Sequence, residues 1–76
     1  MILLSARDCL YLGKHSFNNG YYGQALEWFE ESLSRAHQEG NMTAPVDEIR
    51  PFYTMAATIV RLLTKAAVAN ITAGKQ

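Results

Sequence analysis

The chain has 76 residues, of which 49% are apolar, and its seven basic side chains balance seven acidic ones. A neutral balance gives no reason to expect a nucleic acid or an anionic membrane as a partner. A chain of this length forms one small domain at most, and folding buries only about 60% of the surface that the unfolded chain exposes. We therefore expect a single domain over residues 1–76, stabilised further wherever a neighbour or a second copy covers an apolar face.

Neither a disulfide nor a membrane span is expected. Cys9 is the only cysteine, which excludes an internal disulfide and a CxxC metal or redox site. We expect Cys9 to be a small buried apolar residue, with a reactive or intermolecular thiol as the alternative. No uninterrupted apolar run approaches the roughly 18–20 residues of a spanning helix, so the sequence favours a protein without a membrane partner.

Residue sets that carry catalysis are missing from the sequence. His15 and His37 are predicted to lie on different helices, and no third ligand stands at metal-binding spacing. The sequence contains no His-x-Asp start of an iron site, no phosphate-binding loop and no serine-nucleophile motif. We therefore expect the chain to be no enzyme by itself and to hold no cofactor.

Two amphipathic helices are predicted before residue 40. Ser5 and Asp8 have the form of a capping box, which predicts a first helix over about residues 6–19 that ends before Gly20. Apolar residues at intervals of three and four predict a second helix over about residues 21–37. These residues are Tyr22, Ala25, Leu26, Phe29, Leu33 and Ala36.

Residues 38–50 are predicted to form a loop, and residues 51–70 a third helix. The start of this helix has two interpretations. Asp47 is a suitable N-cap, but Pro51 would then remove the first intrahelical hydrogen bond. A start at Arg50 places Pro51 at the first helical position, which suits proline better. Because no stretch sustains a period of two, strands are not expected and the fold class is all-α.

The first two helices also match a repeat pattern. The matching residues are Leu12, Gly13, Gly20, Tyr22, Ala25 and Phe29, with Ser32 where alanine is usual. They stand in the register of the tetratricopeptide repeat, a helix–turn–helix unit of about 34 residues. Small residues at two of these positions let antiparallel helices approach closely. The pattern predicts a tetratricopeptide-type hairpin over residues 6–37 plus a third long helix; an unrelated helical hairpin is the alternative.

A longer stretch carries a family resemblance. Residues 8–14 read Asp-Cys-Leu-Tyr-Leu-Gly-Lys, and Phe17, Tyr21-Tyr22 and Trp28 follow. This resembles the peptide-substrate-binding domain of the collagen prolyl 4-hydroxylase α subunit, which has Asp-Cys-x-x-Leu-Gly-Lys at its start and a tryptophan midway along its second helix. The resemblance covers roughly residues 5–50 and fades beyond them.

The resemblance implies a non-catalytic module that binds proline-rich, procollagen-type peptides in the extended polyproline II form. In that family the module is joined to a catalytic dioxygenase domain that uses Fe(II), 2-oxoglutarate and ascorbate. The enzyme works with protein disulfide isomerase as its partner subunit in the endoplasmic reticulum lumen. These features are expectations that the resemblance brings, and none of them comes from composition or periodicity.

The resemblance also implies where a peptide would bind. It places contacts on the inner face of the first helix at Leu10, Lys14 and Phe17, and on the third helix at Tyr53. Phe17 stands where the family has a peptide-contacting tyrosine, so the ring is kept and the hydroxyl is lost. A core position against the third helix is the alternative for Phe17.

The third helix departs from the family. Alignment through Val46-Asp47 places Thr54, Ala57 and Val60 at the positions of a tyrosine ladder, and the family's peptide-clamping Arg and Asn of a fifth helix have no counterpart. The alternative function is therefore a structural scaffold without a peptide ligand, in which the apolar face of the third helix pairs with another chain, for example in a homodimer.

Two sequons for N-glycosylation begin at Asn41 and Asn70. The first lies in the predicted loop, where a glycosylation site is accessible. Both sequons agree with the location in the endoplasmic reticulum lumen that the resemblance implies.

Overall fold

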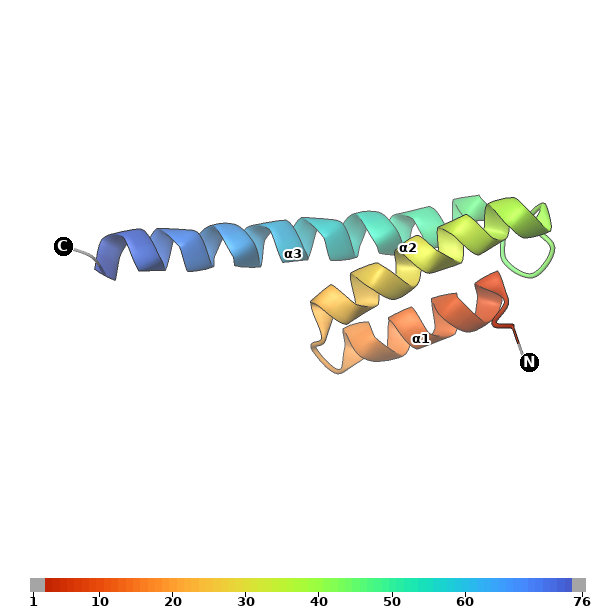
Figure 1. Cartoon of the computed structure of the whole chain (residues 1–76), viewed down its shortest axis with the longest axis horizontal. Helices are drawn as coiled ribbons and strands as arrows, with labels where there is room; N and C mark the ends of the chain where they lie inside the picture. Colours follow the sequence, from red (N-terminus) through yellow and green to blue (C-terminus); the bar gives the residue numbers. More distant parts are fainter. Residues whose placement is uncertain (1–2, 75–76) are drawn as a thin grey trace.

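The computed structural model describes residues 3–74, with side chains described as far as residue 69, and this part of the chain is all-helical. It consists of α1 (Ala6–Asn18), α2 (Tyr22–Glu39) and α3 (Val46–Gly74). Helices α1 and α2 form an antiparallel hairpin, and α3 runs along α2 and continues past the turn of the hairpin (Figure 1). The all-α fold class is confirmed.

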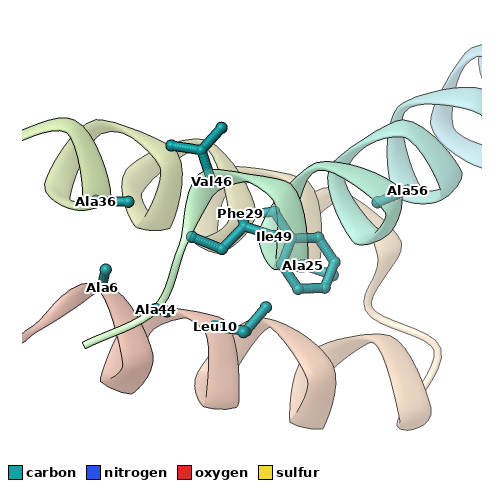
Figure 2. Close-up of a cluster of buried hydrophobic side chains, with 9 residues drawn as sticks. All are labelled: Ala6, Leu10, Ala25, Phe29, Ala36, Ala44, Val46, Ile49 and Ala56. Carbon is teal, nitrogen blue, oxygen red and sulfur yellow. The ribbon is translucent and has the colours of Figure 1, made fainter. Parts of the chain in front are cut away.

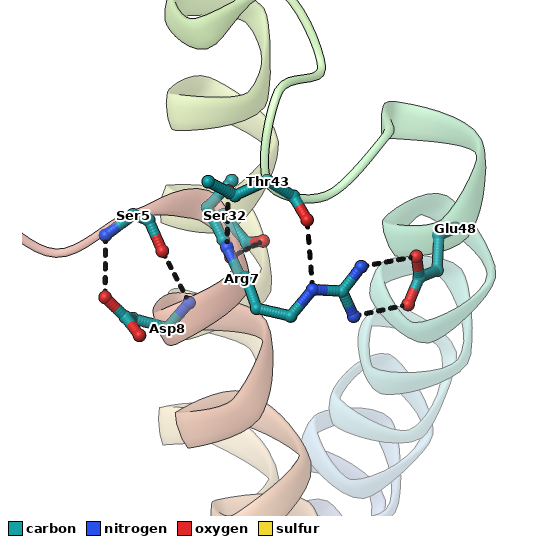
Figure 3. Close-up of polar contacts among 7 residues, drawn as sticks. Ser5, Arg7, Asp8, Ser32, Thr43 and Glu48 are labelled. Atoms are coloured by element: carbon teal, nitrogen blue, oxygen red, sulfur yellow. Dashed lines mark hydrogen bonds and ion pairs between the residues drawn. The ribbon is translucent and has the colours of Figure 1, made fainter.

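The start of α1 is fixed by local hydrogen bonds, as the sequence predicts. The backbone N–H of Ser5 donates to Asp8 Oδ2 at 3.0 Å, and the backbone N–H of Asp8 donates to Ser5 Oγ at 3.1 Å. This capping box satisfies two donors that the first turn of a helix leaves free. Figure 3 shows both bonds. The helix ends at Asn18, one residue before the predicted end, and Gly20 follows with a φ of 83°.

Helix α3 begins at Val46, so the predicted loop over 38–50 and the helix start near residue 51 are wrong. The connection is only residues 40–45. The backbone N–H of Val46 donates to Asn41 Oδ1 at 3.1 Å, and the N–H of Glu48 donates to the Pro45 carbonyl at 3.0 Å. These bonds start the helix two residues before the start that an N-cap at Asp47 gives, and five residues before a start at Pro51. Pro51 lies inside the helix, where it removes a single intrahelical bond in the second turn.

The core is a cluster of small residues around one large ring. Phe29 is 0% exposed and lies between α1 and α3 (Figure 2). Its neighbours in the cluster are Ala6, Leu10, Ala25, Ala36, Ala44, Val46, Ile49 and Ala56. A Cβ atom at Gly13 would lie 2.6 Å from Phe29 Cδ1, so the absence of a side chain there allows α1 to approach the ring. The small residues thus permit close helix packing, as the sequence predicts.

Two polar side chains, Ser32 and Cys9, are buried near the core. The first is hydrogen-bonded and the second is uncharged. The hydroxyl of Ser32 is fully buried and donates to the Ala6 carbonyl at 2.7 Å, so serine replaces the usual alanine with a bond that ties α2 to α1. Cys9 is buried, and its burial raises the pKa of the thiol. A raised pKa keeps the thiol protonated and unreactive at neutral pH, which agrees with the expected role as a small core residue.

Arg7 joins the beginning of α1 to the connection and to α3. Its Nε donates to the Thr43 carbonyl at 3.0 Å, and its two terminal nitrogens donate to the Glu48 carboxylate at 2.8 and 2.9 Å. Glu39 adds a second link, because Oε2 accepts from the Ala6 N–H at 2.8 Å and Oε1 accepts from the Thr43 hydroxyl at 2.6 Å. Figure 3 shows how Arg7 lies between Thr43 and Glu48. These contacts hold the open end of the hairpin together.

The same contacts predict an acid-dependent loss of stability. Hydrogen bonds from Thr43 and from the Ala6 N–H lower the pKa of Glu39, and hydrogen bonds from Arg7 lower the pKa of Glu48. In the pH range where these two carboxylates titrate, the folded chain therefore binds fewer protons than the unfolded chain. Their contribution to the free energy of unfolding is complete above the pKa of the unfolded chain, and it is lost as the pH falls through the lower pKa of the folded chain. We expect the urea midpoint to be level from neutral pH down to about 5 and to decline below about 4.3.

The double variant Glu39→Gln/Glu48→Gln is the control for this prediction. It keeps the size of both side chains and removes both titrating groups. Its urea midpoint should decline less steeply in acid than that of the native chain. Equal declines in the two proteins would show that these carboxylates do not carry the acid dependence.

The C-terminal part of α3 extends beyond the hairpin. Residues 61–69 are all exposed, and the side chains of Leu62 and Leu63 are 60% and 54% exposed. The chain measures 53 × 24 × 19 Å and has a radius of gyration of 15.0 Å, against about 11 Å for a compact domain of this length. We call residues 57–69 the overhang; it lies at the blue end of the ribbon in Figure 1.

Helix α3 is also long and apolar enough to cross a membrane, by length and composition alone. An 18-residue window within Val46–Ala69 reaches a mean hydropathy of 1.2, and little of that window is buried. The sequence has no uninterrupted apolar run of spanning length, but α3 as a whole is long and apolar enough, so the search for apolar runs missed this candidate. Arg61 and Lys65 lie within this stretch, and a charged side chain at the bilayer centre costs at least about 2.5 kcal/mol. Composition is therefore weak evidence for a span.

Candidate functional site

A cavity of about 230 Å³ lies where the second half of α1, the middle of α2 and the second and third turns of α3 meet. It is lined by Lys14, Phe17, Asn18, Phe29, Phe52 and Met55. We call it the α1–α3 groove. Most of its surface is apolar, and its polar groups are an ammonium and a side-chain amide, both of which can donate hydrogen bonds. No acidic side chain is among its lining residues.

The aromatic residues of the groove hold one another in place. The rings of Phe29 and Phe52 have centroids 5.8 Å apart with an interplanar angle of 37°. The ring of Phe17 packs edge-to-face on Tyr22, with centroids 5.0 Å apart and an angle of 74°. Such aromatic pairs contribute about 0.5–1.5 kcal/mol beyond area burial. Phe17 and Phe52 are half-buried, so each presents part of its ring to a ligand.

Lys14 places a cation beside this aromatic surface. Its Nζ lies 4.5 Å from the centroid of the Phe52 ring, within the range of a cation–π interaction. Lys14 is half-buried and is one of the lining residues of the groove. No ion pair within 4.0 Å joins Lys14 to a carboxylate among the described residues. The ammonium therefore remains available to an acceptor on a ligand.

The structure brings together two of the four predicted contact residues. Lys14 and Phe17 both line the groove. Leu10 is 1% exposed, so its assignment as a ligand contact is wrong: residues 40–45 return over the first half of α1, and Ala44 packs in the same core cluster (Figure 2). Tyr53 is half-buried against the core and is not among the lining residues.

The groove residues on α3 were missed from the sequence. Phe52 and Met55, three residues apart, share the side of the helix that faces Phe29 and Lys14. The positions aligned with the tyrosine ladder, Thr54, Ala57 and Val60, are not among the residues that line the cavity. The apolar i, i+3 pair of Phe52 and Met55 was a signal in the sequence, but it does not reveal which side of α3 meets α1.

Two other hollows are larger but are built differently. One, of about 490 Å³, is lined by Gln24, Glu27, Trp28 and Glu31. The other, of about 410 Å³, is lined by Leu4, Arg7, Asp8, Tyr11 and Leu12. Each is formed by side chains of a single helix and the residues next to it. A ligand there would touch one element only, whereas the α1–α3 groove surrounds a ligand with three.

The remaining predicted positions have local structural roles or lie outside the described side chains. Asn41 is exposed, has a φ of 65° and uses its Oδ1 to cap α3, while the side chain of Asn70 lies outside the described residues. In the described part of the chain, no three His, Cys, Asp or Glu side chains are grouped to hold a metal ion.

Comparisons with protein-family models, with curated proteins and with solved structures find no match to this chain.

Proposed function

We propose that the chain is a non-catalytic, tetratricopeptide-like module whose α1–α3 groove binds proline-rich peptides in an extended conformation. The observation that carries this proposal is the pairing of two half-exposed phenyl rings, Phe17 and Phe52, with a lysine ammonium that stacks on one of them. The motif resemblance to the peptide-substrate-binding domain of procollagen prolyl 4-hydroxylases supports the same ligand class. On that resemblance we also propose a location in the endoplasmic reticulum lumen and a dioxygenase domain and protein disulfide isomerase as partners.

Proline matches both the aromatic surface and the hydrogen-bond donors of this groove. A proline residue presents an apolar ring but no backbone N–H, while its carbonyl still accepts hydrogen bonds. The groove offers aromatic surface for the ring, and Lys14 and Asn18 offer donors for the carbonyls. Because the polyproline II conformation is already extended and has no internal hydrogen bonds, binding costs little ordering entropy.

The size of the groove favours a peptide over a compact ligand. Pockets for drug-sized molecules run from about 300 to 1,000 Å³, and this cavity has about 230 Å³. It holds one or two side chains of a chain that continues past it on both sides. An extended peptide meets that requirement, because successive residues contact successive parts of a surface.

Phe17→Ala is expected to weaken binding of a short Pro-Pro-Gly peptide by about three- to tenfold, the equivalent of one lost aromatic contact. Isothermal titration calorimetry measures this with the native chain, the variant and a Gly-Ser peptide of equal length. Tyr11→Ala is the matched control, because Tyr11 is 71% exposed on the same helix and is not a groove residue. No heat from the native chain with millimolar Pro-Pro-Gly peptide, or equal weakening by both variants, would contradict the proposal.

A further inference from the structure

The α1–α3 groove carries charge of one sign only. Lys14 lines it, and none of its lining residues is acidic. The chain as a whole has seven basic and seven acidic side chains, so the unbalanced charge belongs to this groove and not to the overall composition. A ligand in the groove meets the charge beside an apolar surface, where charges are screened less than in open water.

The carboxylate that responds to the Lys14 charge is already paired with another cation. Glu48 stands one turn before Phe52 on α3, and it accepts hydrogen bonds from both terminal nitrogens of Arg7 at 2.8 and 2.9 Å. The bonds from Arg7 are the main cause of the lowered pKa of Glu48, and the charge of Lys14 adds to the effect. Glu48 therefore balances Arg7, and Lys14 keeps its charge for a ligand.

The cation–π contact leaves part of the Lys14 ammonium open. Its Nζ lies 4.5 Å from the centroid of the Phe52 ring, so one side of the ammonium faces the ring and its remaining N–H donors can bind an acceptor. A carboxylate is attracted by the full charge as well as by the hydrogen bond, whereas a neutral carbonyl offers only its dipole. The ligand group that suits Lys14 best is therefore a carboxylate.

The second donor of the groove stands one helical turn away. Asn18 follows Lys14 by four residues on α1, a rise of about 6 Å along the helix. A polyproline II chain rises about 3.1 Å per residue, so residues two positions apart have about the same spacing. A carboxylate on Lys14 and a carbonyl on the Asn18 amide can thus come from one short segment, which leaves the proline between them beside the phenyl rings.

We propose that the groove selects proline-rich peptides that carry an aspartate or glutamate side chain next to their prolines, and that Lys14 pairs with this carboxylate. The inference rests on the proposed function, because it adds a charge requirement to the same site. The carboxylate is that of an internal side chain and not of the peptide's C-terminus, because the groove holds only one or two side chains of a chain that continues past it on both sides.

Isothermal titration calorimetry with three Pro-Pro-Gly peptides of equal length tests this selection. All are acetylated and amidated, and they differ only in carrying Glu, Gln or Lys at one position beside the prolines. The native chain should bind the Glu peptide about three- to tenfold more tightly than the Gln peptide, and the Lys peptide most weakly. Raising NaCl from about 0.05 M to about 0.5 M should reduce this preference, because salt screens a partly exposed pair.

Variants of Lys14 separate its charge from its packing. Lys14→Met keeps the length of the side chain without the charge, and the Glu and Gln peptides should then bind equally, within about twofold. Lys14→Arg keeps the charge and the contact with the ring, so the preference should remain. Lys65→Met is the matched control, because it removes a charge from the exposed overhang, outside the groove, and should leave the preference unchanged. A merely structural Lys14 would weaken both peptides alike and leave their ratio as it is.

The possible results separate this inference from the proposed function. If the native chain binds the Glu and Gln peptides equally, or if its preference survives Lys14→Met, the pairing with Lys14 is wrong and the peptide groove stands. If no peptide binds at millimolar concentration, both are wrong. If a peptide with a free C-terminal carboxylate binds more tightly than its amidated form, and the Glu side chain brings no gain, the proposed source of the carboxylate is wrong.

Discussion

Phe29→Ala is expected to remove about 3–5 kcal/mol of stability, the cost of deleting a fully buried phenyl ring from a core that cannot close over the space. Phe29 is the largest residue of the core and the one around which all three helices meet. A domain of fewer than about 80 residues rarely has more than 3–5 kcal/mol from its core. We therefore expect the variant to be largely unfolded at room temperature.

Urea unfolding followed by circular dichroism measures this effect. Tyr11→Ala is again the control, because it also deletes an aromatic ring but one that is 71% exposed. The control should unfold within about 0.5 kcal/mol of the native chain. A Phe29→Ala variant that loses less than about 1 kcal/mol would contradict the packing described for the core.

Gly13→Val should have the second largest effect, a loss of about 3 kcal/mol, at the upper end of the usual range for overpacking. A Cβ at this position would lie 2.6 Å from Phe29 Cδ1, and the ring cannot move aside because it packs on Phe52. The added side chain therefore pushes α1 away from α2. Valine has the better helix propensity, which offsets only a few tenths of a kcal/mol.

Gly23→Val is the control for Gly13→Val, because it makes the same change in helix propensity without bringing a side chain against Phe29. Gly23 is exposed in the first turn of α2, and a Cβ there would meet nothing within 4 Å. This variant should unfold at a urea concentration equal to or slightly above that of the native chain. If both valine variants are equally stable, close approach at Gly13 is not what fixes the distance between α1 and α2.

The parts of the fold that local chemistry decides were predictable. The capping box of Ser5 and Asp8 fixes the start of α1, and Gly40 ends α2 with a φ of 64°. Each signal acts within a few residues of the position that it specifies, so it is visible in the sequence. The start of α3 was not predictable in this way, because Asn41 caps Val46 from across the connection. Pro51, taken as the first helical residue, lies in the second turn.

The residues of the candidate site were predictable only in part, because contacts between segments far apart in the sequence decide which of them are covered. Leu10 and Lys14 lie one turn apart on the same side of α1. Ala44 packs in the core cluster beside Leu10, whereas Lys14 reaches the open end of the groove. Periodicity gives the shared face but not where another segment covers it. The α3 side of the groove depends on how Phe52 packs on Phe29, which no spacing within α3 reveals.

The sequence resembles the peptide-binding motif of the prolyl 4-hydroxylases on α1 and departs from it on α3, and the proposed groove contains residues from both helices. Of the α1 residues that match the Asp-Cys-x-x-Leu-Gly-Lys motif, Lys14 alone is among the residues that line the groove. On α3, the aromatic contribution comes from Phe52 in place of the tyrosine ladder. A shorter aromatic surface predicts weaker and less selective binding than a full ladder would give, because each ring in contact adds about 0.5–1.5 kcal/mol.

Amide chemical-shift mapping with a Pro-Pro-Gly peptide tests the central claim most directly. The peptide should shift amides around Lys14, Phe17, Asn18, Phe52 and Met55 in one saturable process, and a Gly-Ser peptide should shift none of them. Shifts centred on Trp28 and its neighbours on α2, or no shifts with millimolar peptide, would contradict a peptide site between α1 and α3.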